Sequence, residues 1–148
     1  MANREAAGRL FTPAFADLCE KHDVKLAVLF GSLVTGKASL NSDMDLAVLL
    51  DTKNMVEGSR VGRAARSLLT DLMQLAGTSA IDLVILNRAD SLLRFEVART
   101  GKPIYESAPG TFAEFCSLAL RQHQDSRVFY RVMDRYLERA VRKVPEGG

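Results

Sequence analysis

Three short apolar runs constrain the fold of this chain more than any other feature. Nearly every residue in them is hydrophobic, and they read VKLAVLF (24–30), MDLAVLL (44–50) and IDLVILN (81–87). Runs of this length and composition are typical of strands that are covered on both faces. The sequence therefore predicts a sheet whose strands are buried.

Helical patterns separate and follow these runs. Between the second and third runs, apolar residues recur at i, i+3, i+4 and i+7, which is the spacing of an amphipathic helix. Gly77 is placed to end that helix, and Asp90 is placed to cap the next one. Helices are expected over 13–21, 61–76 and 89–101, with an edge strand over 103–106. This alternation predicts an α/β fold.

The C-terminal segment is expected to be helical. Thr111 and Glu114 have the spacing of a capping box, in which each side chain accepts a hydrogen bond from a backbone N–H of the first turn. The apolar stripe fades over RQHQDSR (121–127) and resumes at Phe129, which fits one long helix or two helices with a joint. From residue 111 onward, seven basic side chains are interleaved with five acidic ones. Such a helix face is either simply solvated or docks a partner.

Length and composition favour a single domain. At 148 residues and 47% apolar composition, the chain has the size of an ordinary globular domain. No linker or internal repeat divides the sequence. We expect one domain over 1–148, with its core at about 22–106, a helical segment over 111–143 and a flexible tail at 144–148.

Charge and hydropathy exclude several classes of protein. The 20 Lys and Arg residues nearly balance 18 Asp and Glu residues, which leaves a formal charge of +2 and predicts no stable binding to nucleic acid. No apolar run approaches the roughly 18 to 20 residues of a membrane span. The first residues, MANREAAGRL, lack the apolar segment of a secretory signal. We expect a cytoplasmic protein.

Acidic residues lie at the start of two of the apolar runs. Side chains alternate across a strand, so Asp43 and Asp45 share one face. Two neighbouring carboxylates in an apolar strand repel each other and lose solvation, and a divalent cation relieves both costs. Asp82 would join them if its strand lies beside theirs. Such a cluster suits Mg²⁺ completed by water and phosphates, and hence phosphoryl or nucleotidyl transfer; the alternative is that each aspartate caps an exposed turn.

A Gly-Ser dipeptide follows the first apolar run directly. Gly31 allows a tight turn and a close approach of the backbone to a ligand. If a helix begins at Ser32, its free N–H groups and the serine hydroxyl provide donors for an anion. The position of the dipeptide, about ten residues before the Asp-x-Asp strand, makes a triphosphate the expected anion; the alternative is an ordinary turn.

Together these residues carry a resemblance to a known family. GSLVTGKASLNSDMDLAVLL (31–50) resembles the signature of the DNA polymerase β-like nucleotidyltransferase superfamily, in which a Gly-Ser turn and a short helix precede Ser-Asp-x-Asp-Leu. The resemblance extends, over IDLVILNRADSLLRFEVARTGKPIYE (81–106) and the helical C-terminus, to the MntA-type adenylyltransferase antitoxins of HEPN/MNT toxin–antitoxin pairs. It implies a small mixed sheet flanked by helices, with a helical segment at the C-terminus.

The resemblance also implies a role for each matching residue. Gly31 and Ser32 would grip the phosphates of the nucleotide. Asp43 and Asp45 would bind Mg²⁺. Asp82 would be the third carboxylate of the metal site and would help to activate the attacking hydroxyl.

Three further residues lie between the Gly-Ser turn and the Asp-x-Asp strand. Thr35 stands where many relatives carry arginine, and the nearest cation is Lys37. Lys37 is either a contact to the triphosphate or a solvated surface lysine. Ser42 either hydrogen-bonds the carboxylates or caps the turn into the strand.

The function that the resemblance implies is that of an Mg²⁺-dependent adenylyltransferase antitoxin. It would transfer AMP from ATP to a hydroxyl, by resemblance that of a tyrosine, on a HEPN ribonuclease toxin with which it forms a hetero-oligomer. Two alternatives stay open. One is transfer to a small molecule, as in aminoglycoside nucleotidyltransferases, and the other is a non-catalytic antitoxin that acts by binding.

Overall fold

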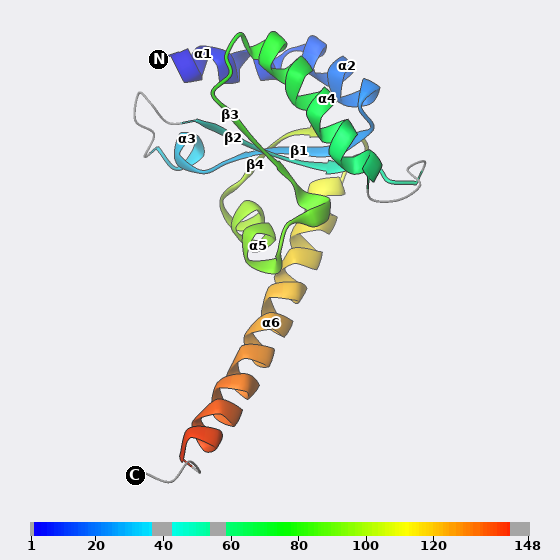
Figure 1. Cartoon of the computed structure of the whole chain (residues 1–148). Coiled ribbons are helices and arrows are strands. Elements are labelled where there is room, and N and C mark those ends of the chain that lie inside the picture. Colours follow the sequence, from blue (N-terminus) through cyan, green and yellow to red (C-terminus); the bar gives the residue numbers. More distant parts are fainter. Residues whose placement is uncertain (1, 37–42, 54–58, 143–148) are drawn as a thin grey trace.

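The computed structural model describes residues 2–36, 43–53 and 59–142 (Figure 1). Its centre is a four-stranded sheet with the strand order β3-β2-β1-β4. The strands are β1 (Val24–Phe30), β2 (Met44–Leu50), β3 (Ile81–Ile85) and β4 (Lys102–Glu106). β2 and β3 are parallel, and the other two neighbouring pairs are antiparallel. The predicted mixed sheet is confirmed, with the last strand at its edge.

Helices cover both faces of this sheet (Figure 1). One layer contains α1 (Ala2–Gly8), the 3₁₀ turn η1 (Arg9–Phe11), α2 (Pro13–Lys21) and α4 (Ser59–Ala76). The other contains α5 (Ser91–Thr100) and the first half of α6 (Thr111–Arg142), while α3 (Ser32–Thr35) follows β1 and the 3₁₀ turn η2 (Leu86–Arg88) follows β3. None of the helices in the described ranges is both long enough and apolar enough to cross a lipid bilayer.

The pleat of β2 divides the hydrophobic core into two clusters. Leu46 points toward α4 and packs in one cluster with Leu72, whereas Ala47 points toward α5 and packs in the other with Val97. All four side chains are fully buried. Asp45 has the same parity as Ala47, so its carboxylate lies on the α5 side of the sheet.

Most predicted element boundaries are confirmed, but the third strand is shorter than expected. β3 ends at Ile85, and the last two residues of IDLVILN form part of η2. The Asn87 carboxamide replaces the missing backbone ladder, because its Oδ1 accepts a hydrogen bond from the Leu50 N–H at 2.9 Å and its Nδ2 donates to the Leu50 carbonyl at 3.0 Å. The chain can therefore leave the strand at Ile85 without orphaning the Leu50 peptide groups.

The start of α6 is where the sequence predicts it, but the capping box is wrong. The Thr111 hydroxyl donates to the Ala108 carbonyl at 2.6 Å, and the Glu114 N–H donates to the Gly110 carbonyl at 3.0 Å. The side-chain acceptor at this helix start is Glu106, which receives the Phe112 N–H at 2.8 Å. Of the two alternatives for this segment, the structure has one continuous helix.

Leu72 provides a test of the packing between α4 and the sheet. It is fully buried, so Leu72→Ala should lower the free energy of unfolding by about 2–5 kcal/mol through lost burial and the cavity that remains. Leu92→Ala is the control, because Leu92 is 61% exposed and its truncation should change stability by about 0.5 kcal/mol at most. Urea denaturation of both variants measures the difference. Equal denaturation midpoints for Leu72→Ala and Leu92→Ala would contradict the packing of Leu72 in the core.

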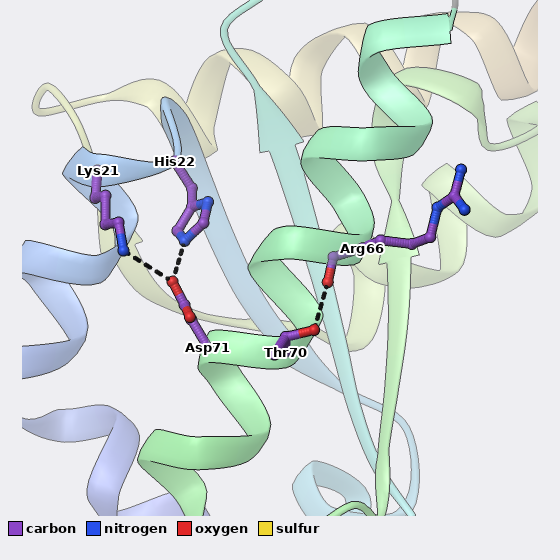
Figure 2. A network of polar contacts seen from close by, with 5 residues as sticks. All are labelled: Lys21, His22, Arg66, Thr70 and Asp71. Atoms are coloured by element: carbon purple, nitrogen blue, oxygen red, sulfur yellow. Dashed lines mark hydrogen bonds and ion pairs between the residues drawn. The ribbon is translucent and has the colours of Figure 1, made fainter.

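A polar contact ties α2 to α4 (Figure 2). The Asp71 carboxylate lies 2.7 Å from His22 Nε2 and 3.2 Å from Lys21 Nζ. The His22 side chain is almost buried, whereas Lys21 is exposed. The hydrogen bond with His22, followed by the one with Lys21, lowers the pKa of Asp71 below its ordinary value.

This contact predicts a pH-dependent contribution to stability. Because the pKa of Asp71 is lower in the folded than in the unfolded protein, the ionised carboxylate stabilises the fold above the unfolded pKa, about 3.9. That contribution is lost as the pH falls through the folded pKa. Asp71→Asn should therefore lower the melting temperature at neutral pH, and the difference from wild type should shrink in acid.

Thermal melts across this pH range measure the effect. Glu96→Gln, which breaks the exposed pair of Glu96 with Arg99, is the control and should matter little at any pH. A gap between wild type and Asp71→Asn that stayed constant from neutral pH into acid would contradict the role of the Asp71 charge.

Candidate active site

The strand register brings two of the predicted acids together. In the parallel pair of β2 and β3, Asp45 is the direct partner of Asp82. Both residues have the parity that points toward α5, so their carboxylates lie on one face of the sheet at the edge where both strands begin. Asp43, which is exposed, precedes β2 at the same edge. The condition under which Asp82 would join the other acids, that β3 lies beside β2, is therefore met.

The structure places Gly31 against the carboxylate of Asp45. The last residue of β1, Phe30, pairs with Asp45 across the antiparallel ladder, and Gly31 follows it. A Cβ at Gly31 would overlap Oδ2 of Asp45 and lie 3.0 Å from its Cγ. Gly31 also has φ +77° and ψ −152°, a region of backbone space that is essentially restricted to glycine. Space and backbone conformation both require glycine here.

The predicted helix after Gly31 is present as the single turn α3. The N–H groups of Val34 and Thr35 donate to the Gly31 carbonyl at 3.2 and 3.1 Å, and the Thr35 hydroxyl donates to the same oxygen at 3.2 Å. Ser32 begins the turn and is half-exposed. The Thr35 hydroxyl thus adds a third hydrogen bond to the carbonyl that closes the turn. The other two candidates for nucleotide binding, Lys37 and Ser42, lie outside the described residues.

The electrostatics of this edge centre on Asp45. Burial raises the pKa of Asp45, and the negative charges of Asp82 and Asp43 raise it further, together with a hydrogen bond between the Asp45 and Asp82 side chains. The fold therefore holds carboxylates closer together than their charges favour. Such unrelieved repulsion is typical of sites that bind a cation or handle a proton.

The donor set fits a magnesium ion that is shared with a substrate. Carboxylate oxygens are the ligands that Mg²⁺ prefers, and it commonly takes only one or two of them, with water and phosphate oxygens completing the octahedron. Within the described ranges, no group of three or more acidic, His or Cys side chains is arranged to hold a metal by itself. Asp43 and Asp45 therefore suit an open site that a nucleotide's phosphates complete, rather than a closed structural one.

The part of the chain that contains this site matches a known protein family. Residues 15–109, which are more than half of the chain, match the family described as polymerase beta, nucleotidyltransferase. The chain belongs to the polymerase β nucleotidyltransferase family. The matched region includes the Gly31 turn, the Asp43-x-Asp45 strand start and Asp82.

One curated relative shares part of this sequence. The protein adenylyltransferase MntA of Aphanizomenon flos-aquae (strain 2012/KM1/D3) is 33% identical over 96 residues, which are 62% of this chain and 63% of that protein. The match thus spans less than two thirds of that relative's length.

Solved structures share the fold at lower identity. A toxin–antitoxin crystal structure with AMP-PNP has a TM-score of 0.65 at 22% identity, over 85% of this chain and 97% of that one. A complex of a tri-AMPylated Shewanella oneidensis HEPN toxin with MNT antitoxin has a TM-score of 0.60 at 18% identity, over 93% and 99% of the two chains. These likenesses establish the polymerase β-like fold, which the sequence resemblance predicted.

Gly31 has a role in the structure that its sequence motif did not predict. Gly31 was expected to serve a turn and a phosphate, but the structure shows that it also leaves room for Asp45. The sequence contains a signal for this contact, since the end of one buried strand and the acidic start of the next one face each other in an antiparallel pair. Only the register identifies the partners.

Proposed function

We propose that this protein is an Mg²⁺-dependent adenylyltransferase that moves AMP from ATP to a hydroxyl of a partner protein. The observation that carries the proposal is the Asp45–Asp82 pair packed against Gly31 at the start of two parallel strands. Family membership supports nucleotidyl transfer, and the raised pKa of Asp45 supports a site that is completed by a cation.

The chain's own residues account for the steps of the transfer. The Gly31 turn lets the nucleotide's phosphates approach the backbone, and the Ser32 hydroxyl donates to a phosphate oxygen. Asp82 accepts the proton of the attacking hydroxyl as its oxygen bonds to the α-phosphorus. The bond between the α-phosphorus and the bridging oxygen breaks, and pyrophosphate leaves with that oxygen and its electron pair. The step is balanced, because the proton goes to Asp82 and the electron pair of the broken bond leaves with pyrophosphate.

Asp43 and Asp45 would hold the metal, with Asp82 as the third carboxylate beside it. Bound there, Mg²⁺ supplies charge neutralisation of the triphosphate and orients the α-phosphate for in-line attack. Lys37 and Ser42 are further proposed contacts to the nucleotide. Because the reaction consumes ATP, we place the protein in the cytoplasm.

The proposed acceptor is a HEPN-family ribonuclease toxin, modified on a tyrosine hydroxyl. Support comes from the Aphanizomenon relative, which is called a protein adenylyltransferase, and from the Shewanella complex, which contains a tri-AMPylated HEPN toxin. Modification would neutralise the toxin, and the two proteins would form a hetero-oligomer. In this proposal the chain acts as one domain, in which the 22–106 core performs the chemistry.

Label transfer tests the acceptor class. The purified protein is incubated with Mg²⁺, α-labelled ATP and one of three acceptors: the product of the neighbouring gene, a panel of aminoglycosides, or RNA with a free 3′ hydroxyl. The proposal predicts label on the protein acceptor alone. Label on an aminoglycoside or on RNA would replace the protein acceptor by that class, and a partner that is inhibited without label would indicate occlusion rather than catalysis.

A further inference from the structure

The outer edge of β3 is a free strand edge. β3 is the last strand on its side of the sheet, and no described strand lies beyond it. It crosses in front of β1 and β2 in Figure 1, at the near margin of the sheet. All of its residues except Asp82 are apolar, and Leu83, Val84 and Ile85 are only half-buried. A free edge of this composition is a template for pairing with another strand.

The backbone groups of β3 alternate between β2 and the free edge. The Met44 N–H of β2 donates to the Ala80 carbonyl at 2.9 Å. Because successive residues of a strand point their backbone groups to opposite sides, residues 80, 82 and 84 face β2. The outward N–H and C=O groups belong to Ile81, Leu83 and Ile85. Among the described residues, no strand pairs with these outward groups.

The opposite edge of the sheet carries residues that hinder strand addition. β4 begins with Lys102 and Pro103, and both are exposed. A lysine, which is charged, and a proline, which has no N–H to donate, are residues with which proteins commonly protect a free edge. β3 contains neither, and its one charged residue, Asp82, belongs to the carboxylate pair of the site. The contrast between the two edges indicates that the β3 edge is open to a partner.

The position of Asp82 indicates which partner would pair here. Phe30, Asp45 and Asp82 are register partners on three neighbouring strands. On an added strand, the residue opposite Asp82 would continue this row on the α5 side, with its Cβ about 5 Å from that of Asp82. Asp82 is exposed, so the described residues leave that space open to an incoming side chain. A hydroxyl carried there would lie beside the carboxylate that accepts its proton.

Charge disfavours a second copy of this chain as the occupant. Two antiparallel β3 strands related by a two-fold axis would place both Asp82 side chains on one face of the joined sheet. Each would add negative charge near the other's carboxylates, and like charges on neighbouring strands are destabilising. An acceptor segment that brings a neutral hydroxyl opposite Asp82 carries no such cost.

We propose that the AMP-accepting protein binds as an added strand along the outer edge of β3, with the residue to be modified opposite Asp82. This inference rests on the proposed function for the acceptor being a protein, and it adds the conformation of the acceptor, which is an extended segment. Backbone hydrogen bonds to β3 would hold the segment. The register opposite Asp82 would select the residue that is modified.

Amide hydrogen exchange, measured for each residue by NMR, tests the pairing. The isotope-labelled full chain is compared alone and with the product of the neighbouring gene, each with Mg²⁺ and a non-hydrolysable ATP analogue. We expect the outward amides of Ile81, Leu83 and Ile85 to exchange about tenfold or more slowly in the complex. The amides of Asp82 and Val84, which face β2, are internal controls and should change little.

A pair of variants tests the same edge by kinetics. Leu83→Pro removes an outward N–H that β2 does not use, whereas Leu83→Ala also shortens the side chain but keeps the N–H. We expect the KM for the acceptor to be about tenfold higher in Leu83→Pro than in Leu83→Ala, with the same affinity for the ATP analogue in both. Equal KM values in the two variants would overturn the strand pairing.

The outcomes separate strand addition from the proposed chemistry. Label transfer to the partner with unchanged exchange at Leu83 would overturn strand addition and leave the proposed function standing. Slower exchange of the outward amides without label transfer would support strand addition and overturn the proposed function. No binding of the partner, or a dimer of this protein alone in which the outward amides are already protected, would overturn the inference.

Discussion

Asp45→Asn should abolish AMP transfer, with a fall in rate of about 1,000-fold or more. The estimate follows because a metal and its carboxylate ligands contribute several kcal/mol to the transition state, and each 1.36 kcal/mol corresponds to tenfold in rate. Asparagine keeps the size of the side chain but removes the charge that would hold the cation. The rate of label transfer at saturating ATP and Mg²⁺ measures the effect.

Stability separates this loss from misfolding. The pKa of Asp45 is raised in the folded protein, so ionising this carboxyl at neutral pH opposes folding, and the penalty disappears in acid below the unfolded pKa. Asp45→Asn should therefore be at least as stable as wild type at pH 7, the pattern expected when a site gives up stability for function. If Asp45→Asn were clearly less stable than wild type at pH 7, the fold would not be holding the Asp45 and Asp82 carboxylates together at a cost in stability.

Asp51→Asn is the matched control for the same strand. Asp51 follows the other end of β2, where its carboxylate accepts a hydrogen bond from the Lys53 N–H at 3.1 Å. Asparagine retains that acceptor, so transfer activity should stay near wild type. If Asp45→Asn and Asp51→Asn lost equal transfer activity, the negative charge of Asp45 beside Asp82 would have no special role in the reaction.

Gly31→Ala should lower both stability and activity. The backbone of Gly31 is in a region that costs other residues about 1–3 kcal/mol, and the added Cβ would overlap the Asp45 carboxylate. Either Asp45 or the end of β1 must move. Because a displacement of about 1 Å in a catalytic group can cost 100-fold in rate, we expect a loss of about that size. Denaturation and label transfer on the same sample measure the two effects.

Gly36→Ala isolates the contact with Asp45 from the cost of a positive φ. Gly36 also has φ +77°, but beyond its chain neighbours no atom of the described residues lies within 4 Å of a Cβ placed there. Its alanine variant should lose about 1 kcal/mol of stability and keep most of the activity. If both glycine variants lost activity equally, the packing of Gly31 against Asp45 would not be what the site requires.

Local patterns in the sequence were sufficient to predict much of the fold. β1 and β2 match the apolar runs residue for residue, because buried strands need continuous hydrophobic side chains. α5 begins after Asp90, whose carboxylate accepts the Leu93 N–H at 2.8 Å as predicted. Strand alternation also predicts Asp43 and Asp45 on one face; in the structure Asp43 precedes β2, and its charge raises the pKa of Asp45.

Features that depend on distant partners could not be predicted in this way. The capping pattern at Thr111 was wrong because Glu106, outside the motif, accepts the hydrogen bond of the first turn. The end of β3 depends on the Asn87 side chain reaching Leu50, and the need for glycine at position 31 depends on Asp45. In each of these contacts, only the folded structure identifies which residues are partners.

The most direct test of the central claim is to locate the cation and the nucleotide in a crystal. Crystals grown with Mn²⁺ and a non-hydrolysable ATP analogue would be measured at a wavelength where manganese scatters anomalously. We expect an anomalous peak bound by the carboxylates of Asp43 and Asp45, with the triphosphate against the Gly31–Ser32 turn. Manganese and nucleotide bound elsewhere, with this edge empty, would contradict the assignment of the site.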